Sequence, residues 1–157
     1  MSWMPCSGRD SVAGLVWLPR LLEKARHCEA SPNGRLVDGY CYGNNDFIDK
    51  QLIAFLRTDD ATISALVREL PSDADVARTL VERSGHSPAE IETFNSAFRR
   101  KNFNFVLLEA DEGRLGPGLK ASVLKFLYNS AVMPIFYPLF RRDERNRTAT
   151  AGSPSAT

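Results

Sequence analysis

Three basic side chains recur at helical spacing near the amino end of this 157-residue chain. Arg20, Lys24 and His27 are spaced i, i+4 and i+7, which places them along one edge of a helix. Trp17 begins the apolar face beside them. A row of cations against an apolar wall can bind a carboxylate or a phosphate, and Arg offers a bidentate fork. We predict an anion site at these four residues. The alternative is a solvated helix edge whose cations pair with surface acids.

A second group of polar side chains lies between residues 39 and 46, where two tyrosines, a thiol and a carboxylate fall within eight positions. If this loop folds over the first helix, Tyr40 or Tyr42 can donate a proton, and Asp46 can orient a cation or a water. His86 is a third candidate, as a general base. The alternative is structural: tyrosines packed at an edge, Asp46 as a helix N-terminal charge, and His86 in a surface turn.

No established catalytic motif completes either group. The chain has no G-x-S-x-G, no phosphate-binding loop, no G-x-G-x-x-G and no pair of histidines on one helix. The spacings of His27, Cys28, Cys41 and His86 match no standard zinc motif. We therefore predict neither a metal nor a cofactor.

Composition limits the class of protein. Twenty basic residues against nineteen acidic ones give a formal charge of +1, which is no electrostatic footprint for nucleic-acid binding. The content of 43% hydrophobic and 25% charged residues is typical of one soluble globular domain.

The cysteines and the amino end indicate the compartment. Cys6, Cys28 and Cys41 are widely spaced and fit neither a disulfide framework nor a C-x-x-C motif. Arg9 and Asp10 interrupt the apolar run that a secretory signal peptide would need. We expect a cytoplasmic protein.

Apolar residues at helical spacing predict a succession of short helices. Their predicted starts are near Trp17, after Asn45 as a cap, and after Asp59, Ser72 and Ser87. The clearest boundary is at Ser87, where Pro88 and Glu90 complete a capping box. Residues 103–108 fit either a short strand or a continued helix. We predict a mainly α fold, a compact bundle of five or six short helices in a single domain over residues 11–140.

The last apolar region runs from Leu119 to Phe140. Pro134 and Pro138 make a regular helix costly in its second half, so we expect a Pro-kinked arm. Residues 123–140 either pack on their own domain or on a second copy, or lie at a membrane surface. The scarcity of Lys and Arg on the apolar segment makes the membrane surface the less favoured alternative. Residues 141–157 are polar and predicted to be disordered.

Two stretches carry a family resemblance: GLVWLPRLLEKAR at residues 14–26, and GYCY at residues 39–42 followed by Asp46. They resemble a family of small bacterial proteins, the domain of unknown function 5069. The resemblance covers about the first hundred residues. It implies a compact, largely helical cytoplasmic domain without an assigned reaction.

Two functions stay open at this point. The first is a small ligand-binding or assembly module that self-associates and takes a small anionic or polar organic ligand, or an acidic peptide, at Arg20, Lys24 and Tyr40. The second is a cofactor-independent isomerase, lyase or cyclase that transfers protons on a small organic substrate. Its candidate groups are Arg20, Tyr40, Asp46 and His86.

Overall fold

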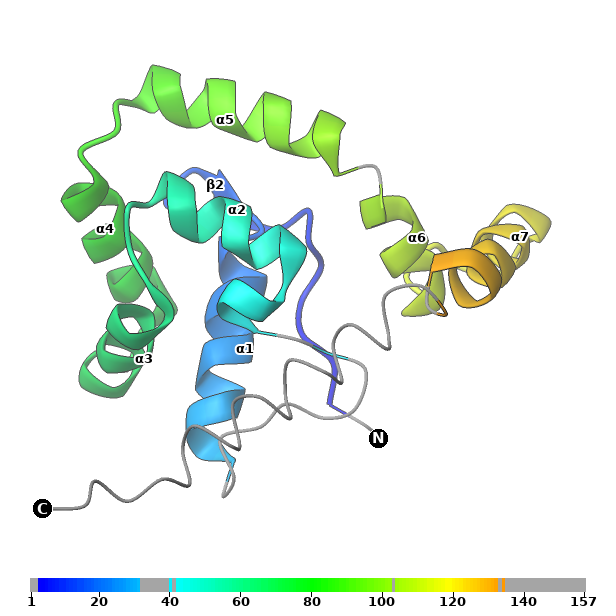
Figure 1. The fold of residues 1–157 in the computed structure, drawn as a ribbon, viewed down its shortest axis with the longest axis horizontal. Helices are drawn as coiled ribbons and strands as arrows, with labels where there is room; N and C mark the ends of the chain where they lie inside the picture. Colours follow the sequence, from blue (N-terminus) through cyan, green and yellow to red (C-terminus); the bar gives the residue numbers. More distant parts are fainter. Residues whose placement is uncertain (1–2, 32–39, 41, 103, 133, 135–157) are drawn as a thin grey trace, which may run out of the picture.

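The computed structural model describes residues 3–31, 40, 42–102, 104–132 and 134 (Figure 1). Within them the chain forms seven α-helices and one two-stranded sheet, so the predicted mainly α fold is confirmed. Cys41 and residues 135–157, which include the end of the predicted arm and the predicted tail, lie outside the described residues.

A tight hairpin leads into the first helix. Strands β1 (Ser11–Val12) and β2 (Leu15–Val16) pair antiparallel, and helix α1 (Leu18–Ala30) follows directly. The Asn95 side chain secures the hairpin from a distant helix: its amide oxygen accepts from the Val16 N–H at 3.2 Å, and its nitrogen donates to the Gly14 carbonyl at 2.7 Å. The hairpin therefore fixes where α1 begins.

Four further helices follow α1 in the main body of the fold. They are α2 (Phe47–Phe55), α3 (Asp60–Glu69), α4 (Asp73–Ser84) and α5 (Pro88–Lys101). The predicted capping box of α5 is present, with the Ser87 and Glu90 side chains each bonded to the other's backbone N–H. The cap of α2 is Asp46 instead of the predicted Asn45, because the Asp46 carboxylate accepts from the Ile48 N–H at 2.8 Å.

Helix α1 lies at the centre of the core. It packs against α3 and α4 on one side, while α5 crosses one end of the molecule (Figure 1). Its apolar stripe is fully buried, as expected for a central amphipathic helix. The stripe consists of Leu18, Leu21, Leu22 and Ala25.

The described chain continues beyond α5 as a helical extension. Helix α6 (Asn104–Asp111) resolves the choice between strand and helix in favour of a helix. Helix α7 (Leu119–Leu127) and a π-helical turn (Tyr128–Val132) pack against α6 (Figure 1). The exposed large apolar side chains of α7 are Leu119, Val123, Phe126 and Leu127. In the described part of the chain no helix combines the length and the hydropathy needed to cross a membrane.

The fold makes a testable prediction at Gly8, whose backbone lies against the Trp17 ring. A Cβ at Gly8 would come within 2.3 Å of ring atom Cζ3, so Gly8→Ala must displace the indole. We expect a loss of about 1–3 kcal/mol in the free energy of unfolding, measured by urea denaturation. Gly118→Ala is the matched control, because nothing lies within 4 Å of its Cβ position. It should change stability by less than about 1 kcal/mol; an equal loss in both variants would contradict the packing.

Candidate functional site

Two of the three predicted cations point into the protein. Arg20 is 2% exposed and Lys24 is 1% exposed, although both stand on the edge of α1 that a wheel would leave solvated. A buried cation is tolerated only when it is paired and hydrogen-bonded. Carboxylates of this chain supply the pairing, and they divide the site into two adjacent clusters.

The first cluster surrounds Lys24. Its Nζ lies 2.9 Å from the Asp46 carboxylate and 2.6 Å from Asp49. Asp49 is fully buried and also accepts from the Trp17 Nε1–H at 2.7 Å and from the Gly43 N–H at 2.9 Å. One carboxylate thus joins α1, α2, the indole and the turn that precedes α2.

Burial sets the protonation of this cluster. Burial raises the pKa of Asp49, the neighbouring Asp46 charge raises it as well, and the Lys24 cation opposes both effects; together they place the pKa at about 6. Burial alone would lower the pKa of Lys24, but the charges of Asp46 and Asp49 outweigh it and raise that pKa. Lys24 is therefore a cation at neutral pH.

The second cluster surrounds Arg20. Its Nη1 and Nη2 donate to the two oxygens of the Glu112 carboxylate, and Nη1 also donates to the Cys6 carbonyl at 2.7 Å. The guanidinium carbon lies 5.2 Å from the Trp17 ring centroid and 5.6 Å from that of Tyr40. The remaining donor, Nε–H, is buried and has no hydrogen-bond partner among the described residues. We call Arg20 with its Trp17 and Tyr40 walls the Arg20 seat.

Two more donors reach the carboxylate in the Arg20 seat. The Tyr40 hydroxyl lies 3.3 Å from Glu112, and the Arg114 Nε lies 2.8 Å from it. Burial and the Glu112 charge together raise the pKa of Tyr40 to about 12, so the phenol stays protonated and donates. One carboxylate thus receives hydrogen bonds from the Arg20 guanidinium and the Tyr40 hydroxyl of the seat, and from the neighbouring Arg114 cation.

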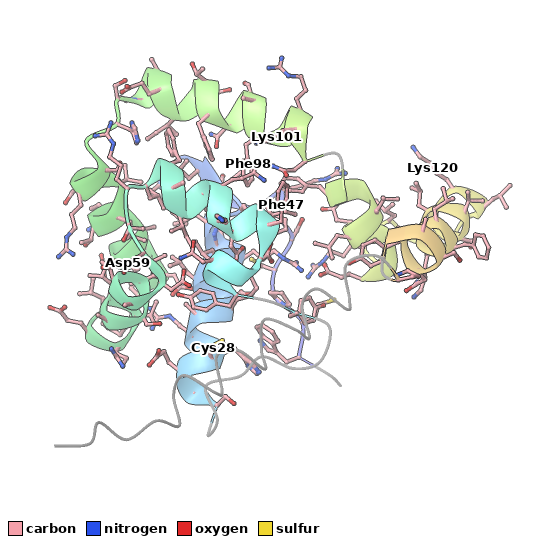
Figure 2. All side chains as sticks on the ribbon, in the orientation of Figure 1. Cys28, Phe47, Asp59, Phe98, Lys101 and Lys120 are labelled. Carbon is pink, nitrogen blue, oxygen red and sulfur yellow. The ribbon has the colours of Figure 1, made fainter. Side chains whose placement is uncertain are left out.

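Trp17 separates and supports the two clusters. Its backbone is left-handed, with φ of 69°, a strained conformation for a bulky residue. The indole N–H is held by Asp49, and the ring stacks on Phe105 with centroids 4.7 Å apart. Phe98 points from α5 into the molecule and meets the edge of the same ring (Figure 2). The apolar wall predicted beside the cations is therefore a fixed indole.

The two histidines lie in different places. The His27 ring stacks on Trp3 with centroids 3.9 Å apart, and Trp3 meets the Tyr40 ring edge-on, so His27 borders the Arg20 seat. His86 stacks on Phe55 and its Nε2 donates to the Phe55 carbonyl at 2.7 Å. It lines a separate open groove of about 440 Å³.

The structure thus brings five of the predicted residues together and leaves His86 apart. The five are Trp17, Arg20, Lys24, Tyr40 and Asp46. Sequence reasoning missed Asp49 and Glu112. Asp49 had a signal, because it is the one acid on an apolar stripe with Leu52 and Ile53. No local sequence signal marks Glu112, since it contacts Arg20 across 92 residues of chain. Within the described ranges no three His, Cys, Asp or Glu side chains are placed to share a metal ion.

Fold and site together define a small helical domain built around a buried network of cations and carboxylates. Residues 3–104 match the family model described as Domain of unknown function (DUF5069), so the chain belongs to this family, as its opening motif predicted. No curated protein and no solved structure is significantly similar to the chain. The Lys24 cluster lies wholly inside the matched region, whereas Glu112 lies beyond it.

The Lys24 cluster predicts an unusual titration. The ¹³Cγ resonance of Asp49 should titrate near pH 6, above the ordinary value of 3.8, and Lys24→Met should move the midpoint higher because the opposing cation is gone. Since the pKa is raised in the folded state, the stability contributed by protonated Asp49 is complete below pH 3.8 and is lost as the pH rises through about 6. NMR titration measures the midpoint; a value below 4 would contradict the role assigned to burial.

Proposed function

We propose that this protein is a small binding module that recognises a carboxylate at the Arg20 seat. The observation that carries the proposal is a guanidinium, 2% exposed, that holds both oxygens of one carboxylate between two aromatic rings. Bidentate pairing with a planar carboxylate is the geometry that favours Arg over Lys.

The neighbouring groups favour an organic carboxylate as the ligand, with an apolar part beside its carboxylate. The Tyr40 hydroxyl adds a neutral donor, and Trp17 adds an apolar wall. The buried Arg20 Nε–H is one further donor that a bound molecule with a second acceptor would satisfy.

Lys24 and His27 take different roles in this proposal. Lys24 is a positioning residue, because its charge is balanced by Asp46 and Asp49. Through these contacts it holds the start of α2 and the Trp17 indole in place. His27 lies at the border of the seat through its stack on Trp3. The cytoplasmic location and self-association through residues 123–140 stay predictions.

A proton-transfer enzyme is the second candidate. The raised pKa of Asp49, about 6, favours it, because a buried carboxyl that titrates near neutrality is suited to acid–base catalysis. Asp46 belongs to the same cluster as this carboxyl, but Tyr40 contacts Glu112 in the Arg20 seat and His86 lines the separate groove with Phe55. The carboxylate-binding function therefore has the stronger support.

Chemical rescue tests the proposal. Glu112→Ala removes the internal carboxylate and leaves Arg20 buried without its partner, which should cost about 3–5 kcal/mol. Acetate should then bind the vacated seat and restore stability. At ten times its dissociation constant it adds about 1.4 kcal/mol, which raises Tm by about 3–6 °C in a chain of this size. Differential scanning fluorimetry against matched sodium chloride measures the shift.

The controls separate a specific seat from a general salt effect. Arg20→Met combined with Glu112→Ala should show no acetate response, because the fork is gone. Glu82→Ala removes an exposed carboxylate on α4 and should leave both Tm and the acetate response as in the unmodified protein. An equal acetate response with and without Arg20 would overturn the proposed function.

A further inference from the structure

Helix α6 and the residue after it present three anchoring side chains on one face. Phe105, Glu109 and Glu112 are spaced i, i+4 and i+7, and the Glu112 N–H still bonds to the Leu108 carbonyl in helical fashion at 2.9 Å. The side chains of all three are buried: Phe105 is 6% exposed as a residue, and the side chains of Glu109 and Glu112 are 7% and 3% exposed. Buried glutamates are rare unless they are paired.

Each anchor meets a different part of the family region. Phe105 stacks on Trp17 and meets the Phe98 ring edge-on with centroids 5.6 Å apart. Glu109 accepts from the Ser7 hydroxyl at 2.7 Å and pairs with the Arg9 Nε at 2.8 Å. Glu112 fills the Arg20 seat, as described above. The contacts combine one apolar anchor with two ion pairs along two helical turns.

The receiving surface and its occupant belong to different parts of the chain. Trp17, Arg20, Ser7 and Arg9 lie inside the matched residues 3–104, while both glutamates lie beyond residue 104. In Figure 1, α6 lies beside the amino-terminal segment, after the connection that follows α5. The family region therefore holds a cationic and aromatic surface that α6 and Glu112 cover.

We propose that this surface, formed by Arg9, Trp17, Arg20 and Tyr40, is a docking site for an acidic amphipathic helix of a partner protein. The partner helix carries Phe, Glu and Glu at i, i+4 and i+7, and α6 is the occupant within the same chain. The proposal rests on the proposed function, because its strongest anchor is the Arg20 seat. It names the ligand class as a helical peptide whose aromatic residue and two carboxylates bind together.

The internal occupant also regulates access. A tethered segment has an effective concentration in the millimolar range, so an external helix competes poorly until α6 is weakened. The unmodified chain should therefore bind such a helix only at high concentration. Weakening the two ion pairs of α6 should expose the surface without removing any receiving residue.

Peptide binding to the full chain tests the docking site. The probe is a fluorescein-labelled peptide of residues 102–116, and the receptor is the chain with Glu109→Gln and Glu112→Gln. Fluorescence anisotropy should give a Kd at least ten-fold lower than for the unmodified chain. A peptide carrying the same two Gln substitutions should bind at least ten-fold more weakly, and Arg20→Gln in the receptor should abolish binding.

A second measurement covers the case in which the substituted receptor is poorly folded. Hydrogen exchange of the unmodified chain with millimolar peptide should become faster in α6, as the peptide displaces it, and stay unchanged in α3. Binding that is indifferent to Arg20 or to the peptide glutamates would overturn the docking site. If acetate rescues Glu112→Ala but the peptide neither binds nor displaces α6, the carboxylate seat stands and the docking surface fails; if both experiments fail, both proposals fail.

Discussion

The desolvation of two cations on α1 is the constraint that organises this molecule. Arg20 and Lys24 are nearly inaccessible to water, and a charge in that position must be balanced at close range. Lys24 therefore fixes Asp46, which caps α2, and Asp49, which accepts from the Trp17 indole N–H. Arg20 fixes Glu112, which carries α6 onto the amino-terminal segment. The strained Trp17 backbone persists in a residue whose ring is held by the Asp49 hydrogen bond and the Phe105 stack.

Local chemistry accounts for what could be predicted from the sequence. The Ser87 capping box and the apolar stripe of α1 are set by neighbours within one or two turns, so the helices and the spacing of the cation row could be anticipated. The inward direction of the row could not. A wheel places Arg20 and Lys24 on an edge, and only distant carboxylates decide whether that edge is buried. Asp49 lies 25 residues from Lys24, and Glu112 lies 92 residues from Arg20.

Buried ion pairs of this kind contribute little net stability compared with apolar residues of similar size. Burying Arg20 costs free energy, since its Nε–H lacks a partner among the described residues while its other donors bond to the Glu112 carboxylate and the Cys6 carbonyl. The proposed carboxylate-binding function would account for that arrangement. Trp17 and Arg20 lie within the family region, residues 3–104, while Phe105 and Glu112 contact them from beyond it.

The coupling between Arg20 and Glu112 tests the central claim most directly. A double-mutant cycle with Arg20→Met and Glu112→Met, followed by urea denaturation, isolates their interaction. Glu112→Met leaves the buried Arg20 cation without a carboxylate and should cost about 3–5 kcal/mol, whereas Arg20→Met leaves Glu112 paired with Arg114 and should cost less. The double variant should cost less than the two singles together, with an interaction energy of at least about 2 kcal/mol. Additive losses would mean that the two side chains do not depend on each other, and the account of the Arg20 seat would be wrong.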